Sequence, residues 1–142
     1  MIINLTESNK EYITELEEKF PNVFLTNDIS NDFKNNPYTR YLVYLIENKI
    51  IGFINYYEIY DRIEIVNFNV LDFFQDKHLG SMLLEKLIEN AKEKKMKNIT
   101  LEVRKDNLKA IHIYEKYGFK NICIREKYYN GVDGILMEKE LM

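Results

Sequence analysis

The sequence predicts a single α/β domain, residues 1–142, whose mixed and mostly antiparallel sheet is flanked by helices. Three consecutive strand-like runs joined by short turns predict antiparallel hairpins: Arg40–Glu47, Ile50–Tyr60 and Arg62–Val70. An amphipathic helix and another strand follow, and this β–α–β order makes the two strands around the helix parallel. A chain of 142 residues can bury one hydrophobic core, so a single domain accounts for its length.

The segment before these strands predicts one short strand and two helices. Ile2–Leu5 is the expected first strand. Thr6 or Ser8 is suited to cap a helix that runs to about Phe20, because a proline follows directly. Residues 22–37 give a mixed pattern that favours a second short helix, carried by Phe24, Leu25, Ile29 and Phe33.

The C-terminal half predicts two helices that alternate with strands. The longer helix runs from about Leu79 to Lys95, and the shorter from about Asn107 to Tyr117, where a glycine ends it. Three strands accompany these helices, the last two of them antiparallel: Asn98–Arg104, Phe119–Tyr128 and Ile135–Leu141.

Composition argues against several classes of protein. The formal net charge of −3 does not suit a nucleic-acid-binding protein that relies on overall positive charge. No apolar run is long enough to span a bilayer, and the first residues lack the profile of a signal peptide. The single cysteine, Cys123, suits a reducing compartment, so we expect a cytoplasmic protein. Because Cys123 lies in a strand-like run, we expect its side chain to be buried.

The segment from Val70 to Ser81 is the first candidate for a functional site. A strand here breaks into a turn and then opens a helix, which leaves several backbone N–H groups without intrahelical partners. These amides and the positive end of the helix dipole favour a phosphate group. Gly80 allows close approach of the backbone, and Lys77 adds a positive charge. The same pattern also occurs at junctions that bind nothing.

Two polar side chains interrupt elements that are otherwise apolar. Glu102 lies in the middle of a strand, where it faces solvent, pairs with Arg104 or has a chemical role. Tyr114 lies on the inner face of the shorter helix, where most tyrosines serve packing. His112 lies on the opposite face and is expected at the surface without a role. No metal-ligand cluster and no serine or cysteine nucleophile paired with a histidine is evident, so neither metal nor covalent catalysis is predicted.

Two longer motifs resemble those of a known enzyme family. The turn Gln75-Asp76-Lys77-His78-Leu79-Gly80 resembles the acyl-CoA pyrophosphate loop of the GNAT family of N-acetyltransferases, written Q/R-x-x-G-x-G/A. The run Leu-Glu-Val-Arg-x-x-Asn-x-x-Ala-Ile-x-x-Tyr-Glu-x-x-Gly-Phe, residues 101–119, is similar to the signature of one bacterial branch. That branch acetylates the N-terminal alanine of a small-subunit ribosomal protein. Further matches to it are Tyr128, Tyr129, Asp133 and Met137.

The resemblance implies a role for each matching residue, with acetyl-CoA as co-substrate and a protein N-terminus, such as that of a ribosomal protein, as acceptor. Backbone groups of the splayed strand would pair with the pantetheine arm, at Phe68, Asn69 and Val70. Backbone amides of the turn would hold the pyrophosphate, at Asp76, Lys77, His78, Leu79, Gly80 and Ser81. Asn107 would anchor the cofactor through its side chain. Glu102 would be the general base and Tyr114 the general acid, and the Val70 N–H would stabilise the oxyanion.

The sequence also departs from the family pattern. His78 stands where the loop has its first glycine, and Asp76 places a carboxylate beside the phosphate site. The tryptophan common after Phe-Pro in this branch is absent, and Asn130 replaces a proline. Two alternatives therefore stay open: acetylation of a small amine such as a polyamine, an amino acid or a drug, and a non-catalytic acyl-CoA-binding module. Glu102 and Tyr114 weigh against the second, because a binding module needs neither.

Overall fold

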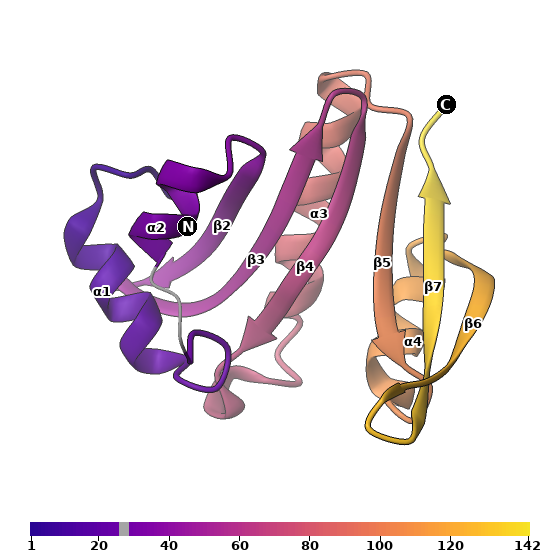
Figure 1. Ribbon diagram of the computed structural model, residues 1–142. Helices are drawn as coiled ribbons and strands as arrows, with labels where there is room; N and C mark the ends of the chain where they lie inside the picture. Colours follow the sequence, from indigo (N-terminus) through magenta and orange to yellow (C-terminus); the bar gives the residue numbers. More distant parts are fainter. Residues whose placement is uncertain (26–28) are drawn as a thin grey trace.

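The computed structural model describes residues 1–25 and 29–142, apart from the side chains of Lys127 and Tyr128. Its described residues form a seven-stranded mixed sheet in the order β1-β2-β3-β4-β5-β7-β6 (Figure 1). The strands are β1 (Ile2–Asn4), β2 (Thr39–Ile46), β3 (Lys49–Ile59), β4 (Arg62–Val70), β5 (Asn98–Arg104), β6 (Lys120–Tyr129) and β7 (Val132–Glu140). All neighbouring strands are antiparallel except β4 and β5. The predicted α/β class with a mixed, mostly antiparallel sheet is therefore confirmed.

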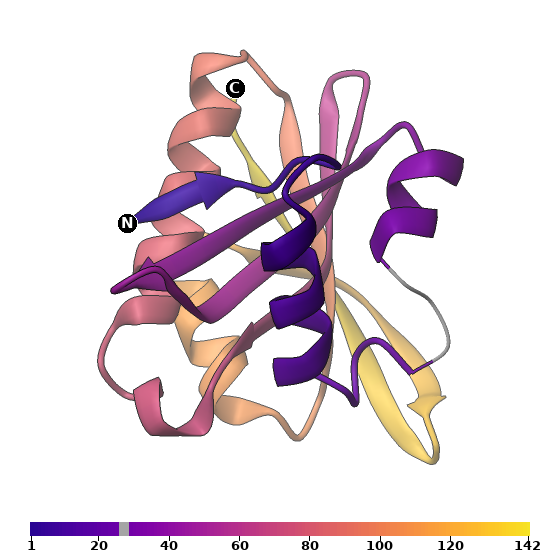
Figure 2. The same ribbon diagram turned by 90° about the vertical axis from the view of Figure 1, so that its left-hand side faces the viewer.

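Helices cover both faces of the sheet. Figure 2 looks onto the face covered by α1 (Lys10–Lys19) and α2 (Ile29–Asn35), with α3 (Leu79–Glu93) and α4 (Leu108–Lys116) behind the sheet. Each face has its own core, because α1 and α2 pack on one set of buried strand residues and α3 and α4 on the other. A short 3-10 turn, η1 (Asp72–Phe74), precedes α3. None of the described helices is long and apolar enough to cross a membrane.

The parallel strands β4 and β5 pair along only part of their length. Their register runs from Arg62 opposite Asn98 to Ile65 opposite Leu101, and beyond that point the strands diverge (Figure 1). The cause lies on the other edge of β4, where Asn67 and Ile65 pair with consecutive residues of β3. Val66 is thus the extra residue of a β-bulge, which bends β4 away from β5. The divergence opens the sheet at the C-terminal ends of both strands.

Most predicted elements are present within one or two residues of their expected ends. Two predictions about individual residues are wrong. The first helix begins at Lys10 with Asn9 at its N-cap, because Thr6 and Ser8 hydrogen-bond to each other and Thr6 also to Asn9. Cys123 is exposed rather than buried, because β6 is the outermost strand and is irregularly paired around this residue.

Candidate active site

A cleft of about 660 Å³ lies between the end of β4, the segment that leads into α3, and α4. Most of the residues singled out in the sequence line it: Phe68, Asn69, Val70, Asp76, His78, Leu79, Gly80, Ser81, Asn107 and Tyr114. Residues far apart in the sequence therefore meet at one cavity. Two of the residues singled out, Lys77 and Glu102, lie outside its lining.

The backbone of the turn before α3 is left-handed at two residues. Asp76 and His78 both have a φ of 62°, and His78 is the N-cap of α3 without a capping hydrogen bond from its side chain. Histidine is one of the few residues other than glycine that are enriched at such positions. The turn directs the first amides of α3 toward the cleft, and these amides have no intrahelical acceptors. Gly80 lies close to the floor, since a Cβ there would be 3.4 Å from the Phe68 ring.

Charged side chains near the turn have partners that the sequence did not reveal. The Lys77 ammonium lies 4.5 Å from the centroid of the Phe73 ring, so it stacks on an exposed aromatic side chain outside the cleft. Asp76 is exposed and forms an ion pair with Lys109, which ties the turn to α4 across the cleft.

One stripe of α4 lines the cleft and was missed in the sequence. Lys109, His112 and Lys116 all face it, although His112 was assigned no role. The i, i+3, i+7 spacing of these basic residues, with Asn107 just before them, was the available signal. The two lysines place positive charge on the α4 wall of the cleft, where Asp76 pairs with that of Lys109.

Asn107 caps α4, since its side-chain oxygen accepts a hydrogen bond of 3.2 Å from the Ala110 amide. The carboxamide is therefore held in a fixed orientation. Its nitrogen remains the group able to donate a hydrogen bond to a molecule in the cleft.

Tyr114 closes the inner end of the cleft. It is buried, and its ring lies 6.3 Å from that of Phe68 and 5.6 Å from that of Phe119, centroid to centroid. Burial raises the pKa of Tyr114 well above its ordinary value, and the nearby Tyr129 phenol adds to the shift. The hydroxyl thus stays protonated and can donate a proton throughout the neutral and moderately alkaline range.

Glu102 lies on β5 directly after the last residue that pairs with β4. Leu101 and Val103 pack into the α3 and α4 core, so Glu102 points to the opposite face of the opening. One carboxylate oxygen forms an ion pair with the Arg125 guanidinium at 3.1 Å. The other is buried and has no hydrogen-bond partner among the described residues. The alternative of a pair with Arg104 is not realised, because Arg104 pairs with Asp106 at 3.0 Å.

The remaining predicted residues lie at the β6–β7 hairpin. The Tyr129 ring centroid is 5.9 Å from the Arg104 guanidinium carbon, and the Asp133 carboxylate is 4.0 Å from Lys105. The Tyr128 side chain lies outside the described part of the structure.

The outer edge of β4 completes the site. The Leu71 amide donates to the Ile51 carbonyl, which makes Gly52 and Val70 a pair that exchanges no hydrogen bonds. The Val70 N–H and C=O therefore point away from β3, toward the opening, as the 3.0 Å hydrogen bond from Gln75 to the Val70 carbonyl also requires. The free edge of β4 can pair with an extended ligand chain.

Fold and cleft together define a class of enzymes that hold an acyl-CoA between two diverging parallel strands. The residues fit such a ligand, because the α3 N-terminus and the basic side chains of α4 line the cleft and would contact its phosphates. The edge of β4 would pair with its pantetheine amides. The chain belongs to the acetyltransferase (GNAT) family, whose model matches residues 6–119. It is an acetyl-CoA-dependent N-acetyltransferase.

Named relatives lie in the same family. The [ribosomal protein bS18]-alanine N-acetyltransferase of Haemophilus influenzae is 43% identical over 103 residues, which span 71% of this chain and 70% of that protein. The crystal structure of the ribosomal-protein-S18-alanine N-acetyltransferase from Escherichia coli matches with a TM-score of 0.83 at 23% identity, over 99% of this chain and 94% of the other. A GNAT family acetyltransferase from Elizabethkingia anophelis, solved with acetyl-CoA bound, matches with a TM-score of 0.75 at 22% identity, over 99% and 97%.

Proposed function

We propose that the enzyme acetylates the N-terminal α-amine of a protein, as a ribosomal-protein-alanine N-acetyltransferase does. The observation that carries transfer to an amine is the buried, unpartnered carboxylate oxygen of Glu102 at the opening between β4 and β5. Such an atom is costly unless it serves a ligand or a proton. The choice of a protein N-terminus rests on the relative from Haemophilus influenzae, whose name states that substrate.

The cleft residues hold the acetyl donor. The amides of Leu79, Gly80 and Ser81 bind the pyrophosphate at the start of α3, and the α4 stripe adds positive charge. The edge of β4 at Phe68 pairs with the pantetheine arm, and the Asn107 side chain donates a hydrogen bond to it. The Lys77 side chain has no direct part in this arrangement, because its ammonium stacks on Phe73.

Three proton transfers accompany acetyl transfer. The acceptor arrives as an ammonium and cannot attack a thioester until Glu102, directly or through water, takes one proton. The new C–N bond forms as the C–S bond breaks, and Tyr114 protonates the departing thiolate. The acylated nitrogen then loses its second proton, which returns to the Tyr114 oxygen, directly or through water, and restores the phenol. The Val70 N–H stabilises the negative charge that develops on the carbonyl oxygen. An α-amine, with an ordinary pKa of about 8, loses its proton far more easily than a lysine amine at about 10.4.

The test is a thiol-release assay with acetyl-CoA and a panel of acceptors. We expect alanine-initiated peptides to react faster than polyamines, free amino acids or lysine side chains. The matched control is the same peptide with its α-amine blocked and an internal lysine left free, which should not react. If polyamines react fastest, the result would favour a small-molecule acetyltransferase. If no amine is acetylated, it would favour a binding module. Because a ribosomal acceptor is found in the cytoplasm, we propose the same location for the enzyme.

A further inference from the structure

A second cavity of about 370 Å³ opens on the face of the sheet covered by α1 and α2. Its volume lies within the range of pockets that bind small groups. It shares β4 with the donor cleft: Val66 and Asn67 line the second cavity, and Phe68 lines the cleft. The two cavities therefore lie on opposite faces of the sheet, on either side of β4 where it leaves β5.

A chain of hydrogen bonds leads from Asn67, at this point of β4, to Asp32 on α2. The Asn67 side chain donates to that of Asn55 at 3.3 Å, and Asn55 donates to the Thr39 hydroxyl at 3.0 Å. The Thr39 and Tyr41 hydroxyls each donate to the same Asp32 carboxylate oxygen at 2.7 Å. Asn55 is buried, so the chain is a fixed part of the cavity. It holds the Asp32 carboxylate in one place.

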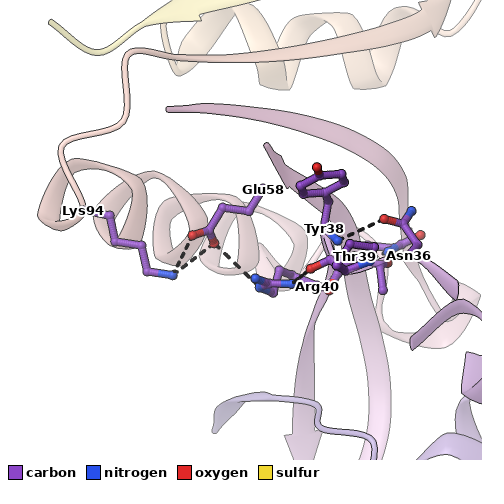
Figure 3. Close-up of polar contacts among 8 residues, drawn as sticks. Asn36, Tyr38, Thr39, Arg40, Glu58 and Lys94 are labelled. Carbon is purple, nitrogen blue, oxygen red and sulfur yellow. Dashed lines mark hydrogen bonds and ion pairs between the residues drawn. The ribbon is translucent and has the colours of Figure 1, made fainter. Parts of the chain in front are cut away.

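Asp32 is the single charged residue among the described residues of the cavity lining. Arg40, one residue beyond Thr39, donates to the carbonyls of Pro37 and Thr39 at 2.9 and 2.8 Å and lies 3.9 Å from Glu58 (Figure 3). Lys94 also binds Glu58, at 3.0 Å. Both cations are thus engaged at Glu58. Among its described lining residues, the cavity presents a negative charge and no cation. In agreement, the pKa of the Tyr57 phenol is raised, mainly by burial and next by the negative charge of Asp32.

Building on the proposed function, we infer that this cavity binds a cationic side chain, arginine or lysine, at position 2 or 3 of the acceptor protein. Glu102 points to the same face of the sheet, so an acceptor whose amine reaches Glu102 extends over this face. Apolar walls at Phe24, Tyr57 and Val66 suit the methylene stem of such a side chain. Asp32 then pairs with its charged end.

The test compares peptides that begin with alanine and differ only at position 2 or 3, as arginine, lysine, glutamine or glutamate. Wild type should acetylate the cationic peptides with a kcat/KM about tenfold or more above the glutamine peptides, because a buried charged hydrogen bond has roughly this value. Asp32→Asn keeps an oxygen that accepts from Thr39 and Tyr41, so the fold should persist. It should bring the cationic and glutamine peptides to within about twofold of each other.

The control is Glu11→Gln, which removes the same charge from the exposed side of α1 and should keep the preference. Melting temperatures of the three proteins check that each is folded. The inference is overturned if wild type shows no preference, if Asp32→Asn keeps it, or if Asp32→Asn slows all peptides alike. Absence of peptide acetylation by wild type would instead contradict the proposed function, so the two failures are distinguishable.

Discussion

His78 shows how one residue satisfies a turn for which the family pattern has glycine. Its φ of 62° and ψ of 13° place it in the left-handed region, where an ordinary side chain costs free energy. A histidine tolerates this geometry and also lines the cleft where phosphates are expected. The departure at this position is therefore compatible with a working donor site.

We expect His78→Gly to change the affinity for acetyl-CoA by less than about tenfold, or ~1.4 kcal/mol. A β-branched residue tolerates this conformation poorly, so His78→Val should weaken binding more. Calorimetric titration of the three proteins measures both effects. Failure of wild type to bind, with tight binding by His78→Gly, would mean that His78 blocks the site.

Tyr114 determines the expected pH dependence. Burial disfavours the phenolate and raises the pKa, so the proton that Tyr114 donates is retained as the pH rises through the neutral range. We expect the ionisation of Tyr114 to cause no fall in the kcat of wild type between about pH 7 and pH 10. Tyr114→Phe should lower kcat about 100-fold or more across that range. An alkaline fall in kcat that Tyr114→Phe abolishes would contradict the role of Tyr114 as a fully protonated acid.

The contact between α1 and β3 depends on one carboxylate. Glu15 accepts from the Lys19 ammonium and from the Ile50 amide, each at 2.7 Å, and Lys19 also donates to the Ile50 carbonyl. Burial acts to raise the pKa of Glu15, but these hydrogen bonds and the positive charges outweigh it and lower the pKa. Its contribution to stability is therefore present above the unfolded pKa and lost as the pH falls through the folded value.

Glu15→Ala should lower the free energy of unfolding by about 1–3 kcal/mol at pH 7, because it leaves a partly buried amide without its acceptor. Urea denaturation at pH 7 measures the effect, and Glu11→Ala on the exposed side of α1 is the control. A Glu15→Ala protein as stable as the Glu11→Ala protein would show that this contact does not hold α1 to the sheet.

Elements whose periodicity is regular could be predicted from the sequence with little error. The alternation in Asn98–Arg104 gave the observed bounds of β5, and the apolar face of α3 was equally clear. Positions whose surroundings depend on tertiary contacts could not be predicted in this way. Cys123 has the sequence context of a buried residue but lies on an edge strand, and Lys77 stacks on Phe73 because of the local path of the turn.

At the scale of the whole molecule, the donor cleft could be predicted and the second cavity could not. The cleft residues lie in two compact motifs, so their order in the sequence already indicated a shared site. The second cavity combines single residues of α2, β2, β3 and β4, such as Asp32, Tyr41, Asn55 and Asn67. No short motif connects them, and only the folded sheet brings them together.

Binding across the cleft should stabilise the whole protein. Acetyl-CoA at about 100 times its Kd adds roughly 2.7 kcal/mol to the free energy of unfolding, which raises the melting temperature by roughly 5–12 °C for a chain of this length. Gly80→Asp should cancel this shift, because a carboxylate in the first turn of α3 repels the pyrophosphate. The same carboxylate interacts favourably with the positive, N-terminal end of the α3 dipole, so the unliganded variant should stay folded. Equal shifts in both proteins would place the donor elsewhere.

Catalysis at the opening between β4 and β5 is tested most directly by the rate of acetyl transfer by Glu102→Gln to an alanine-initiated peptide. The amide cannot accept the ammonium proton, so kcat should fall by about 10²–10⁴ while the calorimetric Kd for acetyl-CoA stays within about twofold. Asp106→Asn, a neutralised carboxylate on the exposed turn after β5, should leave both quantities nearly unchanged. A Glu102→Gln enzyme with kcat within a few-fold of wild type would contradict the role of Glu102 as the base.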